Sequence, residues 1–400
     1  MEADGGWPRA EQSRPWLVVT HDVSYALLIS VSLPMTTSSA SRCLTRGTAF
    51  LLLGLALIAS PAHAQSSTPG GDLDLGSIDF PTSASGEAQT EFLTGVLALH
   101  SFWYPEARDH FQRAQELNPQ FAMAYWGEAM THDHPLWDQH DNAAGRAILD
   151  EMDAVRAQRG LTWSGREQEY VDAIRTLYMG EGGIEARRTA YAEAMQQLAA
   201  QHPNDDEAAA FSALAQMSVD GFDLDEAGDV VPVAAQLEEL YRRHDRHPGV
   251  LHYLIHVYDS DTFAPLGLRP ARTYAEVAPA SSHALHMPSH IFRQLGQWER
   301  VVASNQDAYQ ASVGWQQRTN RPLHMRDYHS YGWLMDAYLA LDRLDDACGL
   351  MQELASIIAT AEERGEDLGR MPSLRTHFSE QYTEATDGTS AAGSCDVAVQ

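Results

Sequence analysis

Two segments of the sequence carry histidine doublets at the spacing of metal ligands on a helix. The doublet His252 and His256 and the doublet His286 and His290 both read Leu-His-x-x-x-His, followed by a β-branched and an aromatic residue. Residues four apart lie on one face of a helix, so each doublet can offer two imidazole nitrogens to one ion. Each residue of the second segment lies 34 positions after its counterpart. This is the period of a helical repeat, so we expect the four imidazoles to converge.

Further candidate ligands lie beside the doublets. His283 precedes His286 by three residues and can join the set, and Asp259 follows His256 by three residues on the same face. Asp259, or Asp336 in the following unit, can ligate a metal or orient a ligating histidine. A site of histidines and carboxylates with room for water suits a divalent Zn, Fe, Mn or Ni ion. The predicted metal-ligand set is His252, His256, His283, His286, His290 and Asp259.

A structural role for these histidines is the alternative. Stacked repeats reuse residues for packing, and paired imidazoles can simply bond carbonyl groups, acids or each other. Isolated histidines are expected to pack rather than ligate, and they include His100, His132, His134, His324 and His329. The sequence contains neither the HExxH pattern of zinc proteases nor the GxSxG elbow of serine hydrolases.

The segments around the doublets have the pattern of paired helices. Gly95 is followed by Ala107, Phe111, Ala114 and Pro119. The small residues permit two antiparallel helices to approach closely, Phe111 fills the space beside them, and the proline ends the second helix. This pattern resembles the tetratricopeptide repeat (TPR), a helix pair of about 34 residues. The resemblance implies an all-α fold, a right-handed superhelical solenoid of antiparallel helix pairs.

Further repeat starts are predicted at Ala122, at Leu295–Trp298 and at Ala340–Ala347. Between them, residues 138–235 are less regular, and the sequence does not decide whether they form true repeats or a cap over the histidines. We expect the helical-repeat domain to span residues 87–383.

A second, closer resemblance predicts that the protein is exported. The segments AMAYWGEAM, HPLW, HPGVLHYLIHVYDS and HALHMPSHIFRQLGQW are similar to those of a His-rich group of exported bacterial TPR proteins. The histidine pattern of that group matches six positions here, His247, His252, His256, His283, His286 and His290. The resemblance implies fold and export, and supplies no substrate. Members of the wider repeat superfamily bind peptides or proteins in a concave groove.

The charged residues exclude several kinds of function. The chain has 27 basic and 55 acidic residues, a formal net charge of −28, which disfavours binding to nucleic acid. All the basic residues are arginine, because the sequence contains no lysine. A phosphate-binding loop and a pyridoxal phosphate Schiff base both need a lysine, so we expect neither a nucleotide nor pyridoxal phosphate as cofactor.

The N-terminal segment has the pattern of an export signal. Residues 35–64 combine two arginines, an apolar run and an A-x-A cleavage site, and we expect Met35 to be the true start and residues 1–34 to be a non-genuine extension. Residues 65–86 are predicted to form a flexible leader and residues 384–400 a disordered tail. The mature protein is then periplasmic or secreted. No later segment is long and apolar enough to span a membrane.

Two cysteines, Cys348 and Cys395, remain after cleavage. A disulfide between them is compatible with an oxidising compartment, and two cysteines are too few for a cysteine-rich zinc site. The sequence therefore leaves two hypotheses. The first is a protein-, peptide- or ligand-binding module whose inner face carries a histidine pocket, with or without a divalent metal. The second is a metal-dependent enzyme, a hydrolase or an oxidoreductase, that uses the same histidines.

Overall fold

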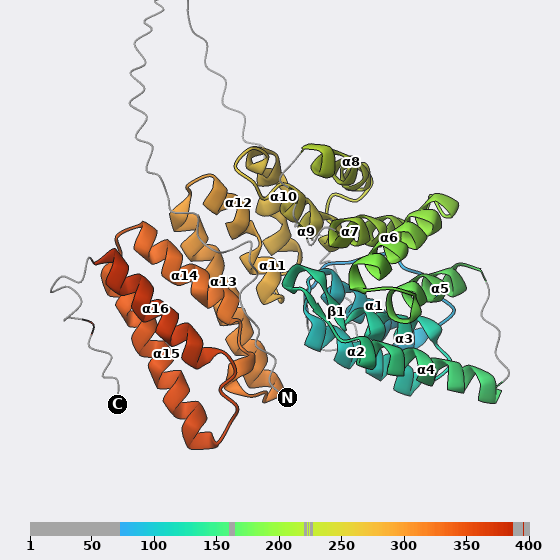
Figure 1. Ribbon diagram of the computed structural model, residues 1–400, viewed down its shortest axis with the longest axis horizontal. Coiled ribbons are helices and arrows are strands. Elements are labelled where there is room, and N and C mark those ends of the chain that lie inside the picture. The colour runs from blue at the N-terminus through green and yellow to red at the C-terminus, as the bar shows by residue number, and fades with distance from the viewer. Residues whose placement is uncertain are drawn as a thin grey trace, which may run out of the picture. The chain divides into compact units, whose positions relative to one another are not determined.

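Residues with high helix propensity, with apolar side chains three and four positions apart, form helices through most of the chain. The computed structural model (Figure 1) describes residues 73–159, 165–219, 222, 224, 227–386 and 395. The expected N-terminal extension and signal peptide lie outside these residues, as do residues 65–72 of the expected leader and most of the expected tail.

The first half of the described chain contains α1 (Gly86–His100), α2 (Tyr104–Leu117), α3 (Ala122–Met130), α4 (Asn142–Arg159), α5 (Arg166–Met179), α6 (Ile184–Gln201), α7 (Asp206–Val219) and α8 (Ala227–Arg243). The second half contains α9 (Pro248–Val257), α10 (Ala264–Val277), α11 (Ser282–His286), α12 (Pro288–Gln294), α13 (Trp298–Thr319), α14 (Tyr328–Ala340), α15 (Leu344–Arg364) and α16 (Met371–Ala385). The short elements are the strands β1 (Asp133–His134) and β2 (Gln139–His140), and the 3-10 turns η2 (Pro135–Trp137) and η3 (Leu323–Met325).

Each helix packs against the next one along the chain, and helices one step further apart also meet, as α1 meets α3 and α14 meets α16. Short connections between packed neighbours make them antiparallel pairs. The predicted all-α, TPR-like fold is therefore confirmed. None of the described helices combines the length and apolar character needed to cross a bilayer.

The first helix pair shows why the repeat pattern produces close packing. Phe111 of α2 is fully buried, and a Cβ atom added at Gly95 of α1 would lie 2.7 Å from its ring. A Cβ added at Gly127 of α3 would lie 2.3 Å from the same ring. Glycine at both positions lets three helices close around one phenylalanine. Truncation of such a buried ring to alanine costs about 3–5 kcal/mol.

The described part of the expected leader, residues 73–85, is irregular but packed. Leu75 and Phe80 are each 1% exposed, and the ring of Phe80 lies 5.4 Å from that of Phe92 and 6.2 Å from that of Trp126. The expectation of a flexible leader is wrong for this part, because isolated apolar residues in a polar segment bury themselves between the helices.

The segment that looked irregular in the sequence, residues 138–235, contains α4 to α7 and the beginning of α8. Around its start, β1 and β2 form an antiparallel hairpin that encloses η2 and presents Trp137. Asp133 of β1 accepts hydrogen bonds from His140 of β2 and from Arg188 of α6, each at 2.9 Å. These bonds fasten the hairpin to the helices.

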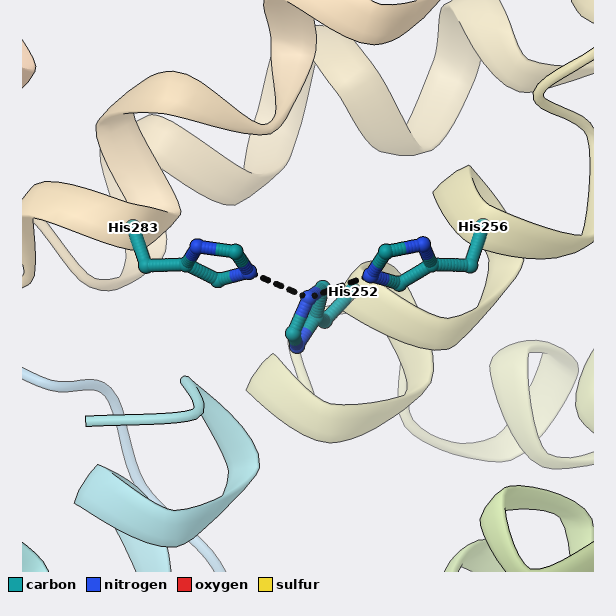
Figure 2. A group of neighbouring side chains, drawn as sticks. All are labelled: His252, His256 and His283. Carbon is teal, nitrogen blue, oxygen red and sulfur yellow. Dashed lines mark hydrogen bonds between the residues drawn. The ribbon is translucent and has the colours of Figure 1, made fainter. Parts of the chain in front are cut away.

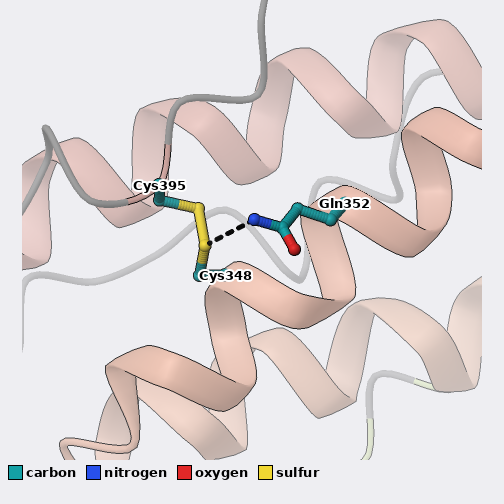
Figure 3. The surroundings of a disulfide bond; sticks show 3 residues. All are labelled: Cys348, Gln352 and Cys395. Carbon is teal, nitrogen blue, oxygen red and sulfur yellow. Dashed lines mark hydrogen bonds between the residues drawn. A yellow bond between two sulfur atoms is a disulfide. The ribbon is translucent and has the colours of Figure 1, made fainter.

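Cys348 of α15 forms a disulfide with Cys395 (Figure 3). Cys395 is one position of the expected tail that the structure describes, and α16 extends to Ala385, inside the predicted tail boundary. The bridge therefore ties part of that tail to the helical domain.

Candidate metal centre

Three successive repeat units present histidines toward one another. In α9, Pro248 occupies the first helical turn, where its missing N–H costs nothing, and His252 and His256 follow on one face. In the next unit Pro288 lacks the N–H that would continue α11, so α11 and α12 are separate helices with Met287 between them.

The third unit begins with a helix cap. The side chain of Asp327 accepts a hydrogen bond from the backbone N–H of Ser330 at 3.0 Å, and α14 starts with His329 in its first turn. The α11–α12 unit has a similar cap, in which the Ser281 hydroxyl accepts from the N–H of Ala284 at 3.2 Å.

The first triad consists of His252, His256 and His283 (Figure 2). The Nε2 atom of His252 lies 3.1 Å from Nε2 of His256 and 3.0 Å from Nε2 of His283. In Figure 2 the rings of His256 and His283 approach His252 from opposite sides. His252 is fully buried, His256 is 8% exposed and His283 is half-buried, so His283 is the most accessible ring of the triad.

The second triad consists of His286, His290 and His329, and it repeats the same arrangement one unit later. The Nε2 atom of His286 lies 3.0 Å from Nε2 of His290 and 3.1 Å from Nε2 of His329. Again the central ring is fully buried, and the outer rings are partly exposed. Each triad therefore takes two rings from one unit and the third from the next.

A buried hydrogen-bond network orients the centre of the first triad. His252 donates from Nδ1 to the backbone carbonyl of His100 at 2.6 Å, so in neutral His252 the Nε2 atom carries only a lone pair. The ring of His100 donates to Glu207 at 2.7 Å and accepts from the Tyr253 hydroxyl at 2.8 Å. His247 donates to the other oxygen of Glu207 at 3.0 Å.

The group of His100, Glu207 and His247 has the residue types of a metal site, but its facing atoms are hydrogen-bonded to one another. Glu207 is 1% exposed, and although burial opposes its ionisation, the two histidines lower the pKa of its carboxyl group. We interpret this network as the support that fixes the carbonyl of His100 beneath His252.

The second triad has orienting partners of its own. His286 donates from Nδ1 to the amide oxygen of Asn305 at 2.6 Å, while the amide nitrogen of Asn305 donates to the carbonyl of Val301 at 2.8 Å. The second bond fixes the amide with its oxygen toward His286. His290 donates from Nδ1 to the carboxylate of Asp259 at 2.6 Å. Carboxylate or carbonyl partners on the far nitrogen are typical of histidines that ligate metals.

Five histidines of the two triads are held in the neutral form. Burial is the largest cause, and the neighbouring imidazoles add to it, lowering the pKa well below 6.5 in His252, His256, His283 and His329. For the same reasons the pKa of His286 falls to about 4. A neutral imidazole is the form that ligates metals, so no proton has to leave these rings at neutral pH.

Within each triad, the three Nε2 atoms cannot all form hydrogen bonds with one another. The single lone pair on Nε2 of His252 accepts one hydrogen bond, yet two other Nε2 atoms lie within 3.1 Å. The same holds for His286. With metal–nitrogen bonds of about 2.0–2.1 Å, ligand atoms of a tetrahedral shell lie about 3.3–3.4 Å apart. The two distances from each central Nε2 atom are close to this, and all three ligand atoms of a triad lie within 4.8 Å of one another, so a cation would satisfy what the rings cannot.

Aromatic side chains pack beside both triads. The ring of Phe102 lies 4.4 Å from that of His252, and its backbone adopts the left-handed region with φ of 49°. Such a conformation costs a bulky residue about 1–3 kcal/mol, which surrounding packing must offset. Trp137 of the hairpin lies 6.1 Å from His283, and Trp333 lies 4.5 Å from the nearest ring of the second triad.

The structure divides the predicted site in two. We expected the four doublet imidazoles to form one set, but each doublet forms its own triad, because the third ring comes from the following unit. The structure brings His283 into the first triad. The carboxylate of Asp259 lies against Nδ1 of His290, on the opposite side of the ring from the triad, so it fixes the orientation of His290 and does not join the triad. Asp336 bonds Gln381 and joins neither triad.

Sequence reasoning placed His329 among the isolated histidines, because it lies 43 residues after His286 and not 34. The long helix α13 and the turn η3 lengthen this unit. A usable signal was present nonetheless: His283 follows the cap Ser281 by two residues, and His329 follows the cap Asp327 by two.

Comparison with known proteins adds little beyond fold. No family model and no curated protein matches the chain. Among solved structures, it is similar to a human IFIT1 dimer bound to m7Gppp-AAAA, at 13% identity and a TM-score of 0.39, covering 79% of this chain and 64% of that one. It is also similar to the TPR2AB domain of yeast Sti1 in complex with pHSP90, at 12% identity and a TM-score of 0.26, covering 75% and 98%. The chain thus spans about two thirds of the IFIT1 chain. Both scores are too low to indicate a ligand here.

Proposed function

We propose that this protein is a metalloprotein in which each histidine triad binds one divalent first-row transition-metal ion. The observation that carries the proposal is that, in each triad, two Nε2 atoms lie 3.0–3.1 Å from the Nε2 atom of a central ring whose Nδ1 proton is already donated elsewhere. Six buried or half-buried rings packed in this way without a cation would leave lone pairs facing one another, which is costly in a protein interior.

Three imidazole ligands leave a coordination position for water or a substrate. A metal ion at such a site polarises a bound carbonyl or lowers the pKa of a bound water, and a redox metal transfers electrons. The function then takes the form of a metal-dependent enzyme, a hydrolase or an oxidoreductase. All-imidazole ligation suits Zn, Cu, Fe and Ni better than Mn, which prefers oxygen ligands.

Metal analysis of the chain from residue 65 onward, purified without a histidine tag, tests this proposal. We expect about two metal ions per chain, one per triad. His256→Asn removes a partly exposed member of the first triad and His329→Asn one of the second, so each variant should retain about one ion. His202→Ala is the matched control, since this histidine pairs with Glu169 at 2.6 Å and belongs to neither triad.

Circular dichroism of all variants separates loss of ligand from loss of fold. Folded protein that takes up no Zn, Cu, Fe or Ni, even when each metal is supplied in excess and removed by dialysis, would show that the histidines are structural.

The helix-pair repeat supports a second candidate function, a protein- or peptide-binding module in which the triads are structural. Pairs of this kind stack into surfaces that bind extended partners. Capture of a partner by the metal-free protein, unaffected by His256→Asn and His329→Asn, would favour this candidate over the metalloprotein.

Export is part of the proposal and rests on residues 35–64. The disulfide between Cys348 and Cys395 supports it, because stable disulfides are typical of oxidising compartments. Fractionation of bacterial cells expressing the full chain, with N-terminal sequencing of the product, should find protein beginning at Gln65 outside the cytoplasm.

A further inference from the structure

We propose that the two triads form one dinuclear centre, which holds a pair of copper ions bridged by a small oxygen ligand such as hydroxide. This inference rests on the proposed metal-binding function and adds the coupling of the two sites and the identity of the metal.

The two triads lie against each other. The ring centroids of His256 and His290 are 5.9 Å apart, and so are those of His283 and His286. These separations across the boundary are shorter than the 6.5 Å between His256 and His283 inside the first triad. The six rings therefore form one continuous cluster.

Two pairs of neighbouring rings make the contact between the triads, so two ions held by the triads would lie next to each other. Functional metal pairs lie about 3.5–4 Å apart, a separation that a single bridging atom spans.

The ligand set distinguishes copper from the metals of other dinuclear centres in helical proteins. Di-iron and di-manganese centres of helix bundles use glutamates from several helices as ligands. Neither triad here contains a carboxylate, and Asp259 contacts His290 at its far nitrogen, away from the triad. Imidazole sets suit copper, which also heads the affinity order of divalent first-row metals. Because imidazoles are neutral, they also bind Cu(I) without leaving an uncompensated negative charge at the site.

The position of the aromatic walls suits such a pair. Phe102 contacts the first triad and Trp333 the second, so each ion would have an aromatic side chain beside its ligands. An apolar wall limits the access of bulk water to the pair.

Electron paramagnetic resonance of the copper-loaded protein is the test. Two Cu(II) ions joined by one bridging oxygen couple antiferromagnetically, so the wild-type chain loaded with about two Cu(II) should give a spin count well below half of its copper content. The single-triad variants His256→Asn and His329→Asn should bind about one Cu(II) each and show a spin count equal to their copper content.

The outcomes separate this inference from the proposed function. Two copper ions per wild-type chain with a full spin count would overturn the dinuclear centre and leave two independent metal sites standing. Zinc in place of copper, in protein isolated from cells grown with both metals at equal supply, would overturn the metal identity. Failure to bind any metal would overturn both proposals.

Discussion

The orienting role of Asn305 gives the most discriminating prediction. Asn305 is fully buried, and its amide oxygen accepts the Nδ1 proton of His286, the central ring of the second triad, at 2.6 Å. Asn305→Leu keeps the side-chain volume but removes the acceptor, so the ring loses the bond that fixes its tautomer and orientation. Loss of such a partner typically weakens metal affinity 10–100-fold, about 1.4–2.8 kcal/mol.

The effect should fall on one triad alone. In a His256→Asn background only the second triad remains intact, so competition with a chromogenic chelator for Zn²⁺ measures its dissociation constant directly. We expect Asn305→Leu to raise that constant 10–100-fold there, and to leave the first triad unchanged in a His329→Asn background. Gln306→Leu is the control, since the neighbouring Gln306 bonds the Tyr338 hydroxyl instead.

A Zn²⁺ affinity of the second triad that stays within twofold of the parent, in folded Asn305→Leu protein, would refute the orienting role. Equal weakening of both triads would refute it as well, because it would indicate a general loss of structure and not the loss of one hydrogen bond.

Three further predictions follow from the same structure. A Cβ at Gly249 would lie 2.4 Å from Nδ1 of the hydrogen-bonded ring of His100, so Gly249→Ala should destabilise the fold by about 1–3 kcal/mol and lower metal content at the first triad alone, as measured by thermal melting and metal analysis. Burial lowers the pKa of His286 from 6.5 to about 4, so the unfolded chain binds more protons below pH 6.5 and the metal-free protein loses stability as pH falls. That loss should reach about 2 kcal/mol at pH 5, seen as the difference in denaturation between wild type and His286→Asn, and an unchanged difference from pH 7.5 to 5 would contradict it. Cys348→Ser opens the loop of 47 residues closed by Cys395 and should lower stability by at most about 4 kcal/mol, and reduction should destabilise the wild type but not the variant.

The sequence predicted those features that depend on local patterns. Gly95 and Phe111 pack as their spacing indicates, and α3 begins at Ala122. Helix propensity and apolar periodicity act over a few residues, so they can be recognised without knowledge of the tertiary structure. The packing of Phe80 against the first helices was missed, because a single aromatic residue in a Ser/Thr-rich segment carries no periodic signal.

The site was predicted only as far as the repeat period holds. The 34-residue step aligns His252 with His286, and the structure gives these two rings equivalent positions at the centres of their triads. The orienting partners were beyond sequence reasoning. The carbonyl of His100 lies 152 residues from His252, and nothing in the sequence indicates that the end of α1 meets α9.

The division of each triad between two units is what allows a repeat fold to build the same site twice. The i, i+4 pair lies on α9 in the first unit and on the consecutive helices α11 and α12 in the second. The first turn of the next unit's helix, fixed by its cap, supplies the third ring. The relation between the two triads therefore depends on stacking between units and not on loop conformation. The extra length of α13 and η3 changes the sequence spacing from 31 residues, between His252 and His283, to 43, between His286 and His329, while the Nε2 distances stay at 3.0 and 3.1 Å. Residues added between repeats therefore leave the histidine geometry unchanged. A site built on the first turns of stacked helices keeps its geometry when a connection lengthens, whereas a site built on the connecting loop would not.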